Sequence, residues 1–433
     1  MREIKDSGIP WIGEIPKEWQ VNMLSSLFDE HKQKNKDLAE TNLLSLSYGK
    51  IVRKDINTKE GLLPESFDGY NIISRGDIVF RLTDLQNDKR SLRTGLCLEK
   101  GIITSAYVTI RERKPLNSSY FHYLLHSYDL CKVFYGMGDG VRQGMNYSDL
   151  RKLLVLHPTL AEQQRIAEFL DRKCAEVDEM IGLQEQIIEE LKAYKQSVIT
   201  EAVTKGLNPD APMRDSGIEW IGQIPAHWET HPFKAFYKTT KGLNITKENL
   251  VESGMPVISY GQIHSKLNSG VRVDEALIRF VPEEYLTTNP ECLSKQHDLF
   301  FADTSEDREG AGNVVYIDID TPIFAGYHTI IARPSEKVQS KYFAYLTQTD
   351  AWRCQLRSRV SGVKVFSISQ KFINQTSVII PPISEQQAIA DYLDEKCADI
   401  DSLIQTKQSK IDSLKEYKKS IIYEYVTGKR EVE

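Results

Sequence analysis

The side chains of this chain that could do chemistry are polar and basic groups gathered in loops. Two such loops, TDLQNDKRSLRTG at 83–95 and TSEDREGAG at 304–312, each follow a β-rich run. Arginine suits the edge of guanine, asparagine and glutamine suit adenine, and lysine suits phosphate. We therefore predict that loops on two β-rich scaffolds contact DNA.

The candidate DNA contacts fall into two groups of polar side chains, one for each half of the chain. The first group is Ser47, Tyr48, Lys50, Arg53, Arg81, Gln86, Asn87, Lys89, Arg90 and Arg142. The second group is Ser259, Tyr260, Gln262, His264, Thr304, Ser305, Arg308, Arg357, Arg359 and Lys364. For each of these residues, an ordinary exposed side chain is the alternative interpretation.

Catalytic signatures are missing from the sequence. It contains no G-x-x-x-x-G-K-[ST] phosphate loop, no G-x-S-x-G elbow, no H-E-x-x-H pair and no Asn-Pro-Pro-aromatic tetrapeptide. The nine histidines show no ligand spacing, and the six cysteines form no Cys-x-x-Cys pair. Asp303 with Glu306 and Asp307 could hold a metal, but a solvated loop is the simpler interpretation. We expect no catalytic residue, no metal site and no cofactor in this chain.

A long helix must position these loops, and the chain contains two copies of it. Residues 161–205 place apolar side chains at intervals of three and four, and 384–427 repeat the pattern at a constant offset of 223. Two such stripes can bury each other as an antiparallel coiled-coil-like pair. The predicted interface is Ile166, Leu170, Val177, Ile181, Ile188, Leu191, Ile389, Leu393, Ile400, Ile404, Ile411 and Leu414. The alternative is two separate amphipathic helices, each packed on its own domain.

A second repeat precedes each globular part. DSGIPWIGEIPKEW at 6–19 returns as DSGIEWIGQIPAHW at 215–228, with ten of fourteen positions identical. The stretch is too rich in proline and glycine for a helix, so its tryptophans should pin an extended segment onto a domain. A stacking platform for bases is the alternative role for the tryptophans. The order motif, domain, helix, repeated once, predicts that the last helix ends near the start of the chain.

The parts between motif and helix share one plan of short β-rich runs, a helical segment at 118–134 or 339–356, and a short run before Pro158 or Pro381. Asp77 and Asp298 stand at the same place in this plan. We predict an α+β fold with two domains, 1–157 and 207–380, and helices at 158–206 and 381–433.

The chain has a net charge of −6, with the acidity concentrated in the helices. It has no signal-peptide core and no apolar run of the ~18 residues that a membrane helix needs, so we expect a cytoplasmic protein.

The chain resembles the specificity subunits of type I restriction–modification enzymes. The features that carry the resemblance are the repeated DSGI-WIG-IP--W motif, P-x-x-E-Q-x-x-I-A opening each helix (158–167 and 381–390), and two dissimilar domains. A Gly-Val-Arg or Gly-Val-Lys stretch also precedes each helix (140–142 and 362–364). The resemblance covers essentially the full chain.

This resemblance implies a non-catalytic subunit in which each recognition domain reads one half of a bipartite, asymmetric site on double-stranded DNA. It implies that the helices set the spacer and hold two modification subunits, which would bind S-adenosylmethionine, and that two ATP- and Mg-dependent restriction subunits would join them. A duplicated scaffold that recruits protein and binds no DNA is the alternative. A self-sufficient DNA enzyme is disfavoured by the missing motifs.

Overall fold

The computed structural model describes residues 2–57, 66–83, 92–137, 144–360 and 365–432. Contacts divide the chain into two compact units. Unit 1 is Met1–Glu185 with Gln408–Glu433, and unit 2 is Gln186–Lys407. Each unit therefore takes one globular part and one half of each long helix, a division that differs from the four successive segments expected from the sequence.

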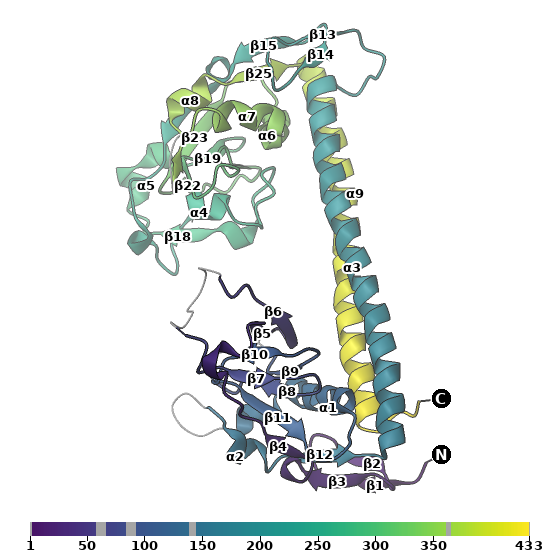
Figure 1. Cartoon of the computed structure of the whole chain (residues 1–433). Helices are drawn as coiled ribbons and strands as arrows, with labels where there is room; N and C mark the ends of the chain where they lie inside the picture. Colours follow the sequence, from purple (N-terminus) through teal and green to yellow (C-terminus); the bar gives the residue numbers. More distant parts are fainter. Residues whose placement is uncertain (1, 58–65, 84–91, 138–143, 361–364, 433) are drawn as a thin grey trace. The chain divides into compact units, whose positions relative to one another are not determined.

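Two long helices, α3 (Leu160–Lys205) and α9 (Ile383–Val426), lie where the apolar stripes predict them (Figure 1). The helix α3 begins after a proline, and the amide of Gln163 donates to Thr159 O in its first turn. Both helices are followed by a glycine with positive φ, Gly206 at 76° and Gly428 at 70°. A left-handed residue at this position is a common way for a helix to end, and glycine adopts it without a side-chain clash.

Unit 1 is built on a four-stranded antiparallel sheet of order β4-β11-β8-β9, with smaller sheets β5-β6, β10-β7, β12-β3 and β1-β2 beside it. The strands are β1 (Ile4–Asp6), β2 (Glu14–Pro16), β3 (Gln20–Met23), β4 (Phe28–Glu30), β5 (Leu44–Ser47), β6 (Lys50–Arg53), β7 (Asn71–Ile73), β8 (Ile78–Phe80), β9 (Thr94–Leu96), β10 (Gly101–Ile103), β11 (Val108–Glu112) and β12 (Leu154–His157). The helices are α1 (Ser118–Leu130) and α2 (Tyr147–Leu150).

Unit 2 repeats this plan with a four-stranded sheet of order β16-β23-β19-β21, a mixed sheet β18-β17-β22, and the pairs β13-β14, β15-β25 and β20-β24. The strands are β13 (Met213–Asp215), β14 (Gln223–Pro225), β15 (Glu229–Pro232), β16 (Tyr237–Lys241), β17 (Met255–Ile258), β18 (Arg279–Val281), β19 (Leu299–Ala302), β20 (Thr304–Ser305), β21 (Val314–Tyr316), β22 (Phe324–Ala325), β23 (Thr329–Pro334), β24 (Phe366–Ser367) and β25 (Ser377–Ile380). The helices are α4 (Tyr260–Ile263), α5 (Tyr285–Thr288), α6 (Ser340–Gln348), α7 (Asp350–Arg357) and α8 (Gln370–Asn374).

Asp77 and Asp298 occupy equivalent places in the two main sheets, as the sequence predicts. Both carboxylates are buried, and each pairs with an arginine of the neighbouring strand. Arg111 Nε lies 2.7 Å from Asp77 Oδ1, and Arg333 Nη2 lies 3.0 Å from Asp298 Oδ2. A buried carboxylate needs such a partner, so the two sheets share one internal ion pair.

The expected single helix over 339–356 is two helices, and this prediction is wrong in detail. Thr349 separates α6 from α7 with an extended backbone, and its hydroxyl accepts from the amide of Trp352 at 3.3 Å. A threonine that caps the N-terminus of a following helix competes with continuation of the preceding one. The break turns α7 so that Trp352 is buried in the core of unit 2.

The two long helices run antiparallel beside each other within each unit. In unit 1, Lys418 Nζ lies 2.6 Å from Asp178 Oδ1, and the rings of Phe169 and Tyr425 have centroids 4.3 Å apart. In unit 2, Lys195 Nζ lies 2.7 Å from Asp401 Oδ1. The two ion pairs involve the same positions of the repeat, so the helices meet through equivalent surfaces.

Burial of the predicted interface residues follows the apolar stripe. Eight are buried and four are half-buried, and the half-buried ones are Ile181, Leu191, Ile404 and Leu414. The stripe does more than join the helices, because Ile166 and Leu170 belong to the hydrophobic core of unit 1 together with Ile421 and Val426. In unit 2, Ile199 and Val203 of α3 share a core with Ile389 and Leu393 of α9. Each helix thus contributes one half to each core.

The end of α9 returns to the first repeated motif inside unit 1. Tyr423 Oη donates to Trp11 O at 3.0 Å, and Lys429 Nζ donates to Glu14 O at 2.5 Å. Both termini of the chain are marked in this region of Figure 1. The order of the repeats predicted this return, because the second motif follows the end of α3 in the same way.

Candidate nucleic-acid interface

The first candidate surface in unit 1 is the hairpin of β5 and β6. Tyr48 and Gly49 form its two-residue turn with φ values of 46° and 78°, the backbone that a tight hairpin of this type requires. Tyr48 is 82% exposed at the tip, and Lys50 is exposed beside it. The hairpin therefore presents an aromatic ring and an ammonium group to solvent, which suits stacking and phosphate contact.

Arg53 lies on the same hairpin, but its guanidinium is already engaged. Its Nε donates to Glu99 Oε1 at 2.8 Å, and Glu99 also accepts from Asn42 Nδ2 at 3.1 Å. The bond to Glu99 raises the pKa of Arg53 and lowers that of Glu99. Arg53 therefore attaches the hairpin to Glu99. The sequence predicted a contact between Arg53 and a DNA base, which is a different role.

The polar loop after β8 has its two ends among the described residues. Arg81 is half-buried, and its amide donates to Arg93 O at 2.9 Å where the loop leaves and re-enters the sheet. Arg93 is buried, and its Nη1 donates to Thr83 O at 2.9 Å, which closes the base of the loop. The remaining predicted contacts lie outside the described residues: Gln86, Asn87, Lys89, Arg90, Arg142 and Lys364.

In unit 2, four predicted residues belong to α4 and its two caps: Ser259, Tyr260, Gln262 and His264. Ser259 is buried at the N-terminal cap of this helix, and its amide donates to Gln262 Oε1 at 3.1 Å. The Ser259 amide and the Gln262 side chain therefore stabilise the first turn of α4. Tyr260 is half-buried, with its ring centroid 5.5 Å from that of Tyr327 and 5.4 Å from that of His328.

The loop from Thr304 to Asn313 lies against α4. Ser305 is buried, whereas Glu306, Asp307 and Arg308 are exposed. The loop leaves strand β20, whose two residues pair with β24, and it rejoins the main sheet at β21. It is therefore held at both ends by sheet hydrogen bonds.

Basic side chains of α7 reach the same loop. Arg357 Nη2 donates to Glu309 O at 2.9 Å and its Nη1 to Asp350 Oδ1 at 2.6 Å, while Arg308 Nε donates to Arg357 O at 2.9 Å. Arg357 and Arg308 thus bind protein groups, and Arg359 is exposed two residues after the end of α7. The structure therefore brings Arg357 of α7 against the 304–313 loop, which carries Arg308, although the helix and the loop are far apart in the sequence.

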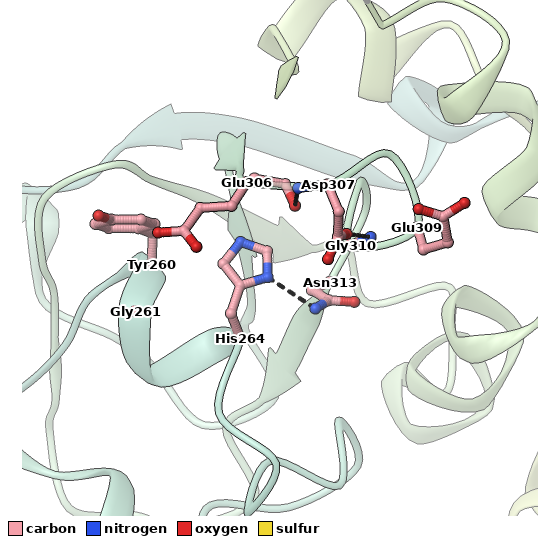
Figure 2. A pocket seen from close by; sticks show the side chains of 9 residues that line it. Tyr260, Gly261, His264, Glu306, Asp307, Glu309, Gly310 and Asn313 are labelled. Carbon is pink, nitrogen blue, oxygen red and sulfur yellow. Dashed lines mark hydrogen bonds between the residues drawn. The ribbon is translucent and has the colours of Figure 1, made fainter. Parts of the chain in front are cut away.

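A cavity of about 570 Å³ separates α4 from this loop (Figure 2). Tyr260, His264 and Ser305, all predicted from the sequence, line it with Glu306 and Asn313. In the figure the side chains of Glu306 and Tyr260 lie on one side of the imidazole, and Asn313 on the other. Hydrogen-bonding groups thus converge on a hollow at the surface of the second domain.

Two residues of this region had no signal in the sequence. Asn313 is half-buried and donates to His264, and Arg353 of α7 donates to Asn313 Oδ1. Burial lowers the pKa of Arg353 to about 10. Neither residue sits in a recognisable motif, because their proximity arises only when α7 packs beside the end of the 304–313 loop.

Within the described ranges no three His, Cys, Asp or Glu side chains are grouped so that they could hold a metal ion. Glu306 and Asp307 are exposed. Asp303 instead lies 3.1 Å from His328 Nδ1. Among the helices of the described residues, none is both long and apolar enough to cross a lipid bilayer.

A family model described as the type I restriction modification DNA specificity domain matches residues 16–193 and 225–426. These two stretches make up most of the chain, so the protein belongs to this family. It is a DNA sequence-specificity subunit of the type I restriction–modification class, a class whose role is specificity and not catalysis. The match occurs twice, once for each copy of the repeat.

Two relatives from Methanocaldococcus jannaschii are similar over most of their length. The type I restriction enzyme MjaVIII specificity subunit is 24% identical over 338 residues, which cover 76% of this chain and 75% of the relative. The putative type I restriction enzyme MjaX specificity subunit is 25% identical over 439 residues, which cover 96% of this chain and 95% of the relative. The similarity includes both repeats.

Solved structures share the fold. One, from a study of complex assembly and conformational transition of the type I R-M system, matches with a TM-score of 0.70 at 15% identity and covers 96% of this chain and 99% of that chain. The HsdS subunit from Thermoanaerobacter tengcongensis matches with a TM-score of 0.51 at 14% identity and covers 96% of this chain and 98% of that chain. The predicted fold class, two α+β domains with a pair of long helices, is confirmed.

Proposed function

We propose that each globular part of this subunit reads one half of a bipartite, asymmetric DNA site. The observation that carries the proposal is that a repeated frame, made of the two DSGI-WIG-IP--W motifs and the two long helices, holds two globular parts with unlike surfaces. The frame repeats its contacts: Trp19 Nε1 donates to Glu162 Oε2 and Trp228 Nε1 to Glu385 Oε2, both at 3.0 Å. The surfaces differ, since unit 1 carries the hairpin of Tyr48 and unit 2 carries α4 with the 304–313 loop. Two globular parts with different surfaces, each attached to the helices through equivalent contacts, suit the recognition of two different half-sites.

The long helices would set the distance between the half-sites and hold the partner subunits. Helix α3 has 46 residues, or about 69 Å at 1.5 Å per residue, which exceeds the ~34–36 Å of one DNA turn. In this proposal two modification subunits bind S-adenosylmethionine and flip the target adenine. Two ATP- and Mg-dependent restriction subunits add cleavage, and the complex acts in the cytoplasm. In this proposal the cofactors are bound by the partner subunits and not by this chain.

Domain exchange tests the proposal. Residues 20–157 are replaced by the corresponding domain of another specificity subunit, and the chimaera is co-expressed with the modification partner. Methylome sequencing should show that one half-site changes while the other half-site and the spacer stay the same. The matched exchange of 229–380 should change only the other half-site.

The control is the chain expressed without its modification partner, which should give no methylation. Changes in both half-sites after a single exchange would contradict the modular assignment. A chimaera that forms the complete complex but methylates the original site would show that the exchanged domain does not read DNA. That result would favour the scaffold alternative.

A further inference from the structure

We propose that His264 is a positioning residue that fixes the 304–313 loop for DNA reading by the second domain. The inference rests on the proposed function, because it assumes that this loop faces DNA. The sequence suggested a direct DNA contact for His264. The structure assigns its ring to the loop instead, and it adds Asn313 and Arg353 as the residues that hold the ring.

Both ring nitrogens of His264 are used within the protein. Nε2 lies 2.7 Å from Thr304 O, at the start of the loop, and Nδ1 lies 2.8 Å from Asn313 Nδ2, at its end (Figure 2). A carbonyl oxygen only accepts, so Nε2 carries the proton and donates to Thr304. The neutral ring then accepts at Nδ1 from the Asn313 amide. One imidazole thus ties together the two ends of the loop.

Arg353 fixes the direction of this hydrogen-bond relay. Its Nη2 donates to Asn313 Oδ1, and a guanidinium has no acceptor atom. The Asn313 amide therefore cannot turn over, because its oxygen must face Arg353 and its NH₂ group must face His264. Because only one orientation of Asn313 and one tautomer of His264 satisfy all three groups, the relay defines a single geometry.

The middle of the loop is held from two sides. Gly310 lies so close to the imidazole that an added Cβ would come within 3.2 Å of His264 Cε1 and 2.4 Å of Ser305 Oγ. On the other side, Arg357 donates to Glu309 O. The exposed side chains of the loop, Glu306, Asp307 and Arg308, are therefore presented from a backbone that α4 and α7 hold between them.

A rigid supporting shell matters for reading bases, because hydrogen bonds to base edges require defined geometry. Breaking the relay should let the loop move without unfolding the unit, since His264 and Asn313 are half-buried at the surface and the core lies beneath them. The consequence should be relaxed discrimination in the half-site that the second domain reads.

The experiment compares two substitutions of Asn313 in the full chain, co-expressed with its modification partner. Asn313→Leu removes both hydrogen bonds and keeps the size of the side chain. Asn313→Asp keeps an acceptor for Arg353 and offers a second acceptor to His264, which can donate from both ring nitrogens when it is protonated. Methylome sequencing measures methylation at cognate sites and at sites with one mismatch in either half.

Asn313→Leu should reduce discrimination against mismatches in the second half-site by about tenfold, because the loop would no longer hold its side chains in one geometry. Discrimination in the first half-site should stay within twofold, and Asn313→Asp should stay near the parent chain. His264→Leu should match Asn313→Leu. Hydrogen exchange should be faster at loop amides in both leucine variants and unchanged in the main sheet.

Unchanged second-half discrimination in both leucine variants would overturn the inference, and so would equal loss in both half-sites, which indicates general destabilisation. The exchange of 229–380 separates these results from failure of the proposed function. If that exchange changes the second half-site but the leucine variants do not, the domain reads DNA and His264 does not position the reading loop.

Discussion

Trp19 and Trp228 show how single residues of the repeated motif act. Each indole donates to the first glutamate of a long helix, Glu162 or Glu385. The next residue of each helix, a glutamine, also makes the same contact in both repeats. Gln163 Oε1 accepts from Asn117 N, and Gln386 Oε1 accepts from Gln339 N, both at 2.9 Å. The E-Q pair of the sequence thus joins the motif and the domain to the helix start. The indoles are packed in the core, which excludes a stacking role for these two tryptophans.

Tyr194 and Tyr417 are large apolar side chains that the repeat leaves exposed in both units. They are 59% and 48% exposed, and Met180 and Leu403, another equivalent pair of the repeat, are 47% and 50% exposed. Because a tyrosine is exposed at the same position of both repeats, this surface favours a partner of which two copies bind, one to each repeat. This suits the two modification subunits of the proposed complex.

Tyr194→Glu and Tyr417→Glu should each leave a complex with one modification subunit, and the double variant should bind none. The physical reason is that a carboxylate must be desolvated in an otherwise apolar contact. Native mass spectrometry of the purified complexes measures the composition. Gln405→Glu is the control, because it adds a charge about 200° around the helix from Leu403. Two bound subunits in the double variant would contradict this docking surface.

At the scale of the elements, the end of each long helix completes the core of a domain. Tyr120 of α1 donates to Val426 O, and Tyr342 of α6 donates to Val203 O, both at 3.1 Å. Both valines are fully buried. The final residues of α9 therefore stabilise the first domain, although they follow the second domain in the sequence.

Val426→Asp should lower hydrogen-exchange protection in 20–157 and leave 229–380 protected, because an unpaired buried carboxylate costs several kcal/mol. Val203→Asp is the matched variant at the same position of the repeat, and it should lower protection in 229–380 instead. Exchange followed by mass spectrometry on the full chain resolves the two regions. A loss of protection in the second domain after Val426→Asp would contradict the assignment of the α9 terminus to unit 1.

At the scale of the whole molecule, the proposed role of the helices is to fix the spacer of the DNA site. Adding four residues after Glu185 and four after Lys407 lengthens each helix by about one turn, or ~6 Å. Because successive base pairs are ~3.4 Å apart, the spacer should grow by about two base pairs while both half-sites stay the same.

Methylome sequencing reads both quantities in one experiment. The control is an insertion of equal length in the exposed stretch after Gly206, which leaves the helices unchanged. An unchanged spacer in the variant with longer helices would show that something other than helix length sets the distance between half-sites.

The sequence by itself determined the repeated frame. Regular spacing of apolar residues predicts α3 and α9 because a helix turns every 3.6 residues, whatever surrounds it. The constant offset of 223 between the two helices then predicts equivalent contacts along them, and the Asp178–Lys418 and Asp401–Lys195 ion pairs confirm this. The break at Thr349 was missed, because the apolar pattern continues through it.

Only the tertiary structure decided which polar side chains are available. Arg53, His264 and Arg357 read alike as DNA contacts in the sequence, yet each has protein partners more than 40 residues away. Whether a polar side chain faces solvent or a distant carbonyl depends on how strands and helices pack, and local spacing carries no record of that. The repeated helices and motifs can therefore be predicted from the local spacing of residues, whereas the surface proposed to contact DNA depends on contacts between residues far apart in the sequence.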